Sequence, residues 1–335
     1  MTTNSLVLQQ VEIIGSGALG SLFAAFLESQ TAITMLSHWE EQIEAVQAKG
    51  LILLDRAGNA TTHEFRITNN PRDLLPASLA LVLVKSYQTA RTGFELAPIL
   101  APDGVAITLQ NGLGNLEVLQ AALGHGRVIQ GVTAQGAMML EPGRVKHAGT
   151  GLTYFAHLPG KDHVLSHLTN LLNAAGLPAK ILADVKSLQW GKLAVNAGIN
   201  PLTAILRVPN GHLIEHEIVS QVMCAAAEET ALVAKALGIS LPFPDASERV
   251  MEVAEATATN FSSMLQDVLR GVPTEIDAIN GAVANHGRLT GVPTPINDEL
   301  WRQVRNIQVQ PTNNFAVDEQ MVLKNLLKMI HGGQE

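Results

Sequence analysis

Three polar residues share one face of an otherwise apolar segment in the second half of the chain. Lys192, Asn196 and Asn200 are spaced at i, i+4 and i+8, which aligns them on one side of a helix. A buried helix carries such a stripe when it faces a ligand or another polar partner. A partly desolvated lysine can exchange a proton near neutral pH, and two amides can hold a carbonyl or hydroxyl group. A lysine reaching solvent beside loop-bound asparagines is the alternative. Pro201 is expected to stop or kink this helix.

A glycine-rich loop near the N-terminus is the second chemical signal. Gly15-Ser16-Gly17-Ala18-Leu19-Gly20 follows a short apolar run and opens a helical stretch. The glycines of G-x-G-x-x-G allow a tight turn, close approach of a pyrophosphate and close helix–strand packing. The helix N-terminus adds N–H groups and partial positive charge. We interpret the loop as a dinucleotide site rather than a purely structural turn.

The residues that close the second apolar run could select the dinucleotide. An acid there binds the ribose 2′-hydroxyl of NAD, whereas Arg or Lys pairs with the 2′-phosphate of NADP. Ser37 and His38 could donate to a phosphate, and Glu40 and Glu41 would oppose one. Ser37 could equally cap the helix that follows. These residues alone leave the choice of cofactor open.

Two more polar residues follow buried strands. Lys85 comes directly after residues 79–84, and Asn111 follows residues 105–109 with one residue between them. Ligands of open α/β sheets bind at the carboxyl ends of the strands. Lys85 could face a phosphate or carboxylate, and Asn111 a nicotinamide, ribose or carbonyl. A solvated lysine and a simple Asn-Gly turn are the alternatives.

Two later segments carry small hydroxyls and acids. Residues 260–267 place Ser263 and its neighbours on a predicted helix, and residues 274–277 place Glu275 at the start of the next one. On their own they are typical of a helix N-cap and first-turn acids.

The first half of the chain alternates strands and helices, which predicts a doubly wound parallel sheet of the α/β class. The strands and helices that we expect are residues 11–14, 18–29, 32–36, 40–49, 79–84, 105–109, 115–123 and 128–133. Residues 51–54 and 64–68 are expected to pair as a hairpin around a turn at 57–59. Antiparallel strands between 143 and 155 are expected at the sheet edge.

The second half of the chain is predicted to be all-helical. Apolar residues recur at helical spacing over residues 188–200, 214–237 and 246–269, with Gly and Pro mostly between them. We therefore expect a dinucleotide-binding domain over residues 1–184 and a helical substrate and catalytic domain over 185–335.

Composition narrows the class of protein. The 335 residues carry a net charge of −8, which disfavours a nucleic-acid partner. The absence of a long apolar run or a signal-like N-terminus predicts a cytoplasmic protein with no membrane partner. One cysteine rules out a disulfide framework, and no metal site is expected. His212 and His216 are spaced at i, i+4, but we expect them to be exposed, with Glu215 pointing elsewhere.

Together these motifs resemble the ketopantoate reductase (2-dehydropantoate 2-reductase) family. The resemblance runs in order over nearly the whole chain, and its helical-half strings are more specific than the glycine loop. They are GSGALG at 15–20, VKSYQT at 84–89, QNGLGN at 110–115, WGKLAVNAGINPLTAI at 190–205, PNG at 209–211, NFSSMLQDV at 260–268 and TEIDAING at 274–281.

The resemblance implies an N-terminal Rossmann domain, a helical C-terminal domain and a cleft between them where NADPH reduces a small 2-keto acid, ketopantoate, to pantoate for pantothenate and coenzyme A synthesis. Lys192 would be the general acid, and Glu275 would lie against the nicotinamide and the substrate hydroxyl. The other implied contacts are to substrate, from Asn196, Asn200, Asn210 and Ser263, and to cofactor, from the glycine loop, Lys85, Asn111 and Ala137, with Asn111 near the reacting carbon.

One departure weakens the expectation of NADP. The family commonly has an arginine after the second strand to bind the 2′-phosphate, and His38 stands near that place. Two other functions stay open: reduction of another small keto acid or imine, and a non-catalytic nucleotide sensor of the same fold. An apolar stripe in the helical half could be core or the surface of a homodimer.

Overall fold

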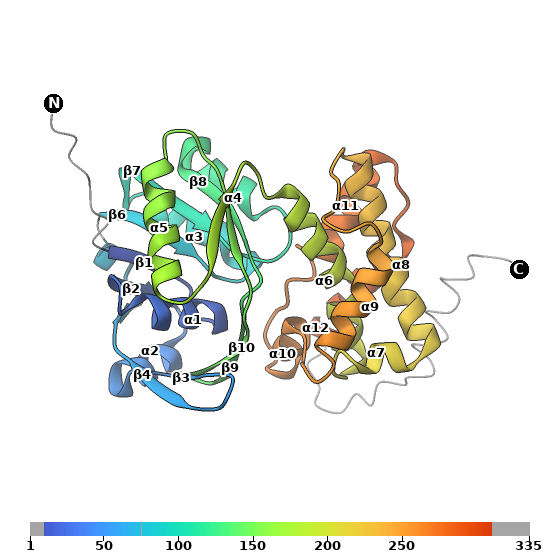
Figure 1. Ribbon diagram of the computed structural model, residues 1–335, viewed down its shortest axis with the longest axis horizontal. Helices are drawn as coiled ribbons and strands as arrows, with labels where there is room; N and C mark the ends of the chain where they lie inside the picture. Colours follow the sequence, from blue (N-terminus) through green and yellow to red (C-terminus); the bar gives the residue numbers. More distant parts are fainter. Residues whose placement is uncertain (1–9, 75, 310–335) are drawn as a thin grey trace, which may run out of the picture. The chain divides into compact units, whose positions relative to one another are not determined.

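The computed structural model describes residues 10–74 and 76–309 (Figure 1). Their contacts divide the chain into two compact units. The first contains the residues up to Gln110 together with Gly114–Val185, and the second contains Asn111–Leu113 and the residues from Lys186 onward. The second unit thus includes Asn111–Leu113, although these residues follow a strand of the first unit. The predicted division between residues 184 and 185 places them in the first domain.

The first unit is built on an eight-stranded sheet in the order β12-β11-β8-β7-β6-β1-β2-β5. From β5 to β8 all neighbours are parallel. This part has the 3-2-1-4-5-6 order of dinucleotide-binding folds, which confirms the predicted fold class. The strands are β1 (Gln10–Ile14), β2 (Ala32–Leu36), β5 (Arg66–Thr68), β6 (Ala77–Val82), β7 (Leu100–Thr108), β8 (Val128–Thr133), β11 (Thr153–Ala156) and β12 (Ala179–Leu182).

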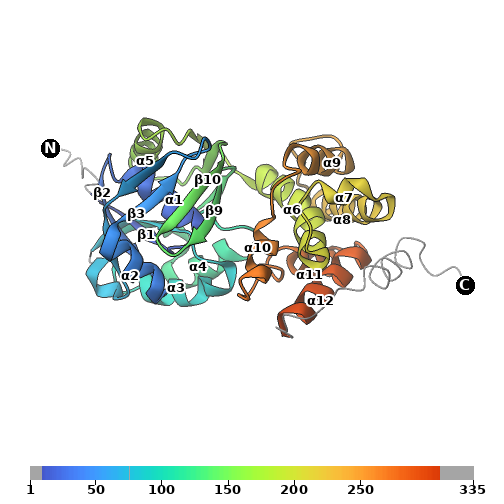
Figure 2. The ribbon, with the colours of Figure 1, turned by 90° about the horizontal axis from the view of Figure 1, so that it is seen from below.

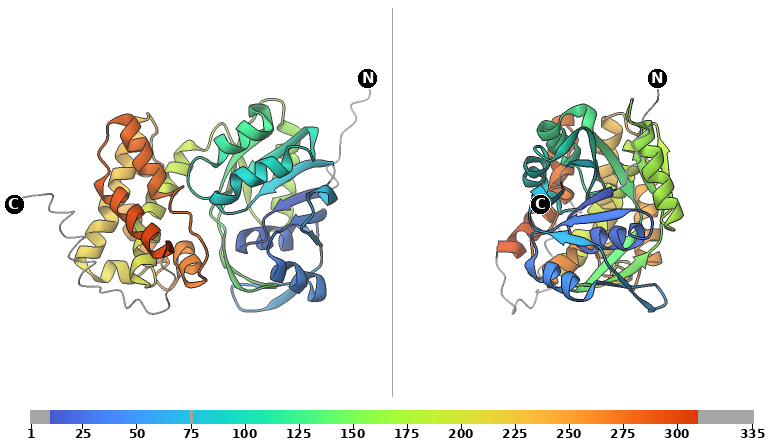
Figure 3. Two further views of the ribbon diagram at one scale, coloured as in Figure 1. Left: turned by 180° about the vertical axis from the view of Figure 1, so that it is seen from behind. Right: turned by 90° about the vertical axis from the view of Figure 1, so that its left-hand side faces the viewer.

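Helices cover both faces of this sheet, because the buried strands are apolar on both sides. Val11 and Ile13 pack in one core with α1 and α5, whereas Ile14 and Val82 pack in another with α3 and α4. The left view of Figure 3 shows α3 and α4 in teal in front of the sheet. The helices of the first unit are α1 (Ala18–Leu27), α2 (Glu40–Lys49), α3 (Thr89–Leu96), α4 (Asn115–Leu123) and α5 (Asp162–Ala174), with the short 3-10 turns η1 (Pro71–Leu74), η2 (Ser86–Gln88) and η3 (His125–Arg127).

A second, four-stranded sheet corrects two predictions. Its order is β4-β3-β10-β9, with β3 (Leu51–Leu54), β4 (Ala60–His63), β9 (Gly136–Glu141) and β10 (Arg144–Gly149). The hairpin partner of β3 is β4, and the segment predicted for that role instead supplies β5, parallel to β2 in the main sheet. Of the strands expected at the sheet edge, only β11 pairs antiparallel with β8, and β10 belongs to the second sheet. Figure 2 shows β9 and β10 beside α1.

The regular elements of the second unit are all helices within its described residues. Its helices are α6 (Lys186–Leu206), α7 (His212–Glu215), α8 (Glu217–Ala236), α9 (Ala246–Ala256), α10 (Ser263–Leu269), α11 (Asn280–Thr290) and α12 (Pro295–Val309). Helix α6 packs against α8, α9, α10 and α12, and its apolar side chains form the centre of the core. No helix in the described part of the chain combines the length and apolar character needed to span a bilayer.

The structure corrects three local expectations for this unit. Of the two effects expected of Pro201, a stop or a kink, the stop is wrong, because α6 continues through Pro201 to Leu206. The stretch predicted as one helix over residues 246–269 is two helices, α9 and α10, with a break between them. Residues 274–277 form turns before α11 begins at Asn280, so Glu275 is not in the first turn of a helix.

Candidate functional site

The glycine loop is held between β1 and α1 by contacts that only glycine allows. Gly15 has φ of 110° and donates from its N–H to the carbonyl oxygen of Leu36 at 2.9 Å. A Cβ on Gly20 would lie 1.9 Å from the carbonyl oxygen of Gly15. The loop therefore requires glycine at both ends, for a left-handed turn and for close packing of helix on loop.

The middle of the loop is open. A Cβ on Gly17 would meet no atom within 4 Å, and Gly17 is the N-cap of the ten-residue helix α1, whose first turn contains no acidic side chain. Ser16 is buried, and Ala18 and Leu19 pack partly against the core. Free space beside the unpaired N–H groups of a helix N-terminus fits a pyrophosphate.

The residues after β2 form a cluster beside this loop. The Ser37 hydroxyl lies 2.5 Å from the Ser16 hydroxyl, which fixes the β2 end against the loop. His38 follows, and its ring contacts Glu95 at 3.1 Å and Arg91 at 3.0 Å, both from α3. Sequence reasoning missed Arg91 and Glu95. Their i, i+4 spacing predicts a local ion pair but does not reveal the contact with His38.

Lys85 does not follow its strand directly as predicted. Strand β6 ends at Val82, and Lys85 is the residue before η2, half-buried, with its N–H donating to the side chain of Gln88 at 3.2 Å. The adjacent loop is fixed by Gln110, whose amide donates to the Val84 carbonyl at 3.0 Å and to the Thr89 hydroxyl at 2.8 Å. Lys85 remains at the carboxyl end of the sheet, near the glycine loop.

Ala137 lies on β9, opposite His147 of β10, and packs partly against the core of the first unit. Strand β9 contacts α1, the helix that begins at the glycine loop.

In the second unit, three predicted residues from distant segments meet. Lys192 is on α6, Glu275 is in the turn before α11, and Asn111 belongs to the short segment after β7. The Asn111 amide donates to the Glu275 carboxylate at 3.4 Å. The segment is held there because the Leu113 N–H donates to the Ala278 carbonyl at 2.9 Å and Gln189 donates to the Gly112 carbonyl at 3.2 Å.

The Lys192 ammonium is electrostatically coupled to this cluster. Burial lowers its pKa from 10.5 to about 8, and the charge of Glu275 opposes that fall. Glu275 itself is 5% exposed. A lysine with a pKa of about 8 is partly deprotonated at neutral to mildly alkaline pH, so it can give or take a proton there. Lys192 is half-buried.

Asn196 and Asn200 occupy the next two turns of α6, as the spacing predicted. Asn196 is half-buried and Asn200 is 6% exposed. Thr203, one turn further, donates to the Ser262 hydroxyl at 2.7 Å, which joins this end of the face to the start of α10. Ser262 is the buried N-cap of α10, and Ser263 beside it is exposed and so available to a ligand.

Asn210 is anchored between α6 and α9. Its amide donates to the Thr257 hydroxyl at 2.8 Å, and its N–H to the Asn260 carbonyl at 3.0 Å. The Asn210 side-chain oxygen is buried without a hydrogen-bond partner among the described residues. A buried acceptor of this kind costs free energy unless a ligand or water satisfies it.

The prediction for Glu215 is wrong. Its carboxylate lies 3.2 Å from His212 and, with His216, offers three possible ligand atoms within 4.8 Å of one another. Helix α7 is a single turn, and Glu215 and His216 are exposed. The pairing of His212 with Glu215 is enough to explain why these side chains lie close together.

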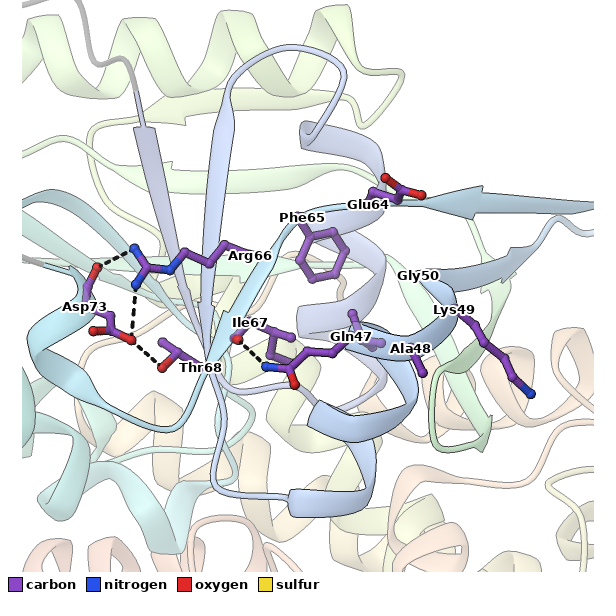
Figure 4. A pocket seen from close by; sticks show the side chains of 11 residues that line it. Gln47, Ala48, Lys49, Gly50, Glu64, Phe65, Arg66, Ile67, Thr68 and Asp73 are labelled. Carbon is purple, nitrogen blue, oxygen red and sulfur yellow. Dashed lines mark hydrogen bonds and ion pairs between the residues drawn. The ribbon is translucent and has the colours of Figure 1, made fainter.

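A pocket of about 690 Å³ lies elsewhere, beside α2 and the edge strand β5 (Figure 4). Arg66 pairs there with Asp73 at 3.2 Å, and Gln47 donates to the Ile67 carbonyl. None of the predicted site residues lines it.

The fold, the residues around the glycine loop and the cluster of Lys192, Glu275 and Asn111 together define a class of protein. It is a dinucleotide-binding oxidoreductase with a doubly wound first unit and a helical second unit. Family models for "Ketopantoate reductase PanE/ApbA" match residues 11–160 and for its C-terminal part residues 184–308. The chain belongs to the ketopantoate reductase family.

The chain is also similar to individual relatives and solved structures. The chain is 37% identical to a 2-dehydropantoate 2-reductase of Archaeoglobus fulgidus, over 90% of this chain and 98% of that one. A PanE/ApbA family ketopantoate reductase from Ralstonia eutropha has a TM-score of 0.82 at 30% identity, covering 90% of this chain and 98% of that one. D-mandelate dehydrogenase, solved with NADH and anilino(oxo)acetate, has a TM-score of 0.84 at 25% identity with the same coverage.

Proposed function

We propose that this protein is an NADPH-dependent reductase that converts 2-dehydropantoate to pantoate. The observation that carries this function is the coupled set of Lys192, Glu275 and Asn111 in the second unit of a chain whose first unit has an open glycine loop. The similarity to 2-dehydropantoate 2-reductases over nearly their whole length supports the substrate.

The residues of the second unit supply the acid and the substrate contacts. Lys192 protonates the carbonyl oxygen as the carbonyl carbon is reduced, and its pKa of about 8 makes it an effective donor near neutral pH. The negative charge of Glu275 raises the pKa of Lys192 and so favours the protonated ammonium. Asn196, Asn200 and Asn210 bind the hydroxyl and carboxylate end, and Ser263 donates to the carboxylate.

The first unit would hold the dinucleotide. Gly17 and the α1 N-terminus would contact the pyrophosphate, His38 would face the adenosine ribose, and Lys85 and Ala137 would line the rest. Asn111, in the second unit, is assigned to the nicotinamide end. When bound, the reduced nicotinamide supplies the hydride. A cytosolic location and a homodimer remain predictions from the sequence.

Replacing Lys192 tests this function. K192M should lower kcat with 2-dehydropantoate by about 10²- to 10⁴-fold, because the general acid is lost. The dissociation constant for NADPH, measured by fluorescence, should stay near that of the wild type. K235M, at an exposed lysine of α8, is the matched control. Wild-type turnover by K192M would exclude Lys192 as the acid.

A different keto acid is the second candidate, because the D-mandelate dehydrogenase neighbour was solved with an oxo acid bearing a bulky group. The wild-type protein should reduce 2-dehydropantoate with a higher kcat/KM than phenylglyoxylate or pyruvate. The reverse order would assign it to another 2-keto acid while leaving the roles of Lys192 and Glu275 intact. Binding of NADPH without turnover on any keto acid would instead indicate a nucleotide sensor.

A further inference from the structure

Arg91 occupies a position that the glycine-loop motif does not specify, yet it stands at the ribose end of the predicted dinucleotide site. Helix α3 brings its guanidinium to His38, the second residue after β2. His38 follows Ser37, whose hydroxyl touches Ser16 of the glycine loop at 2.5 Å. A continuous chain of contacts therefore runs from the phosphate loop to the guanidinium.

The three side chains form a closed triangle. The Arg91 Nη2 donates to the His38 Nδ1 at 3.0 Å, and the Arg91 Nε donates to the Glu95 Oε1 at 2.7 Å. The His38 Nε2 contacts the Glu95 Oε2 at 3.1 Å. Because a guanidinium can only donate, Nδ1 is the acceptor and the ring proton lies on Nε2, facing Glu95. These three contacts fix the orientation of the Arg91 guanidinium and of the His38 ring.

Exposure leaves part of the guanidinium available. The Arg91 side chain is 58% exposed, against 14% for Glu95 and 29% for His38. A planar guanidinium has five N–H donors and binds phosphate through two of them at once. Two of its nitrogens are engaged inside the triangle, and the exposed remainder can face a ligand. In a chain of net charge −8, such a local positive group is what an anionic cofactor needs.

We propose that Arg91, together with His38, binds the adenosine 2′-phosphate of NADPH, and that Glu95 sets the preference between NADPH and NADH by competing with that phosphate. The inference rests on the proposed nicotinamide-dependent function and deepens it.

The carboxylate of Glu95 also bears on whether the site prefers NADH or NADPH. A carboxylate at the ribose can accept a hydrogen bond from a 2′-hydroxyl, which is how NAD is recognised in this fold class. The D-mandelate dehydrogenase neighbour was solved with NADH, so the overall fold does not decide the cofactor. The exposed guanidinium and the absence of an acid at residues 37–39 favour the phosphate.

The test compares R91Q and E95Q with R56Q, a control at an exposed arginine of the first unit. In R91Q, kcat/KM for NADPH should fall about 10- to 100-fold, as expected for a lost charge-assisted contact, and kcat/KM for NADH should change less than about two-fold. In E95Q, kcat/KM for NADPH should rise relative to NADH. Equal losses for both cofactors in R91Q, or a selective loss of NADPH activity in E95Q, would overturn the proposal.

A binding measurement separates this inference from the proposed function. Adenosine 2′,5′-bisphosphate should bind the wild-type protein more tightly than 5′-AMP in calorimetry, and R91Q should abolish the difference while R56Q retains it. If the difference appears but no keto acid is reduced, the proposed reductase function fails and the role of Arg91 stands. If the wild type reduces 2-dehydropantoate but binds both nucleotides equally, the role of Arg91 fails alone.

Discussion

The side-chain amide of Asn280 donates a hydrogen bond of 3.0 Å to the carbonyl oxygen of Ala197. That carbonyl lies four residues before Pro201, which has no N–H to donate to it. Asn280 also donates to Asn297 at 2.9 Å, so its amide joins α6, α11 and α12. The helix therefore passes through its proline with the orphaned carbonyl satisfied from another segment.

Removing this amide should destabilise the protein and disturb the substrate face. N280A should lower the free energy of unfolding in urea by about 1–3 kcal/mol, because the Ala197 carbonyl loses its partner in the core. It should also raise KM for 2-dehydropantoate, since Asn200 lies in the turn just before Pro201. N285A, at an exposed asparagine of α11, is the control. Wild-type stability in N280A would show that water can replace the amide.

The pH profile should report the coupling of Lys192 to Glu275. The general acid must be protonated, so kcat for reduction should be level at low pH and fall as pH rises through the Lys192 pKa of about 8. The Glu275 carboxylate raises that pKa. In E275Q the fall should therefore begin at lower pH, whatever the height of the plateau.

The control for this experiment is E255Q, which removes an exposed carboxylate of α9. Its alkaline limb should coincide with that of the wild type. An alkaline limb that stays in place in E275Q would mean that the group titrating near pH 8 is not Lys192 held by Glu275.

Most of the doubly wound sheet could be predicted from sequence because each βα unit has its own period of apolar residues. The partner of β3 in its hairpin could not be predicted in this way. Phe65 and Ile67 alternate with polar residues like a strand, but Ile67 is buried in the main sheet as part of β5, and Phe65 packs partly against the same core. The true partner of β3 is the threonine-rich β4, whose polar and exposed surface gave no apolar signal.

The candidate site, too, could be predicted from the sequence only in part. The spacing of Lys192, Asn196 and Asn200 is local, so a helical period was enough to place them on one face. The approach of Glu275 depends on a turn rather than a helix, and that of Arg91 on contact with a residue 53 positions away. Such pairs are fixed by tertiary packing, which residue spacing along the chain does not contain.

A buried carboxylate of α8 should be a strong stabiliser of the helical unit. Glu229 accepts from the N–H groups of Ile296 and Asn297, both at 2.9 Å, and so satisfies two donors of the first turn of α12. E229A should lower the free energy of unfolding by about 2–3 kcal/mol. E228A, at the exposed neighbouring residue, should cost less than about 1 kcal/mol. Equal effects of the two variants would contradict this capping role.

A second buried acid should make the stability of the first unit depend on pH. Glu12 of β1 is 2% exposed, and its Oε1 accepts from Gln10 at 2.7 Å. Its Oε2 has no hydrogen-bond partner among the residues that the structure describes. Burial raises the pKa of Glu12 from 4.5 to about 8. The folded protein therefore keeps this proton over a range of pH in which the unfolded chain loses it.

The sign of the effect follows from proton linkage. Because the folded state binds the extra proton, the free energy of unfolding should fall as pH rises from about 4.5 to 8, by at most about 1.4 kcal/mol per unit. E12Q cannot ionise and imitates the protonated acid, so it should match the wild type near pH 5 and be more stable by up to about 4 kcal/mol near pH 8. E44Q, at an exposed glutamate of α2, should show no such divergence. Urea denaturation at both pH values measures the difference, and parallel curves for E12Q and the wild type would mean that the buried carboxyl finds a partner when it ionises.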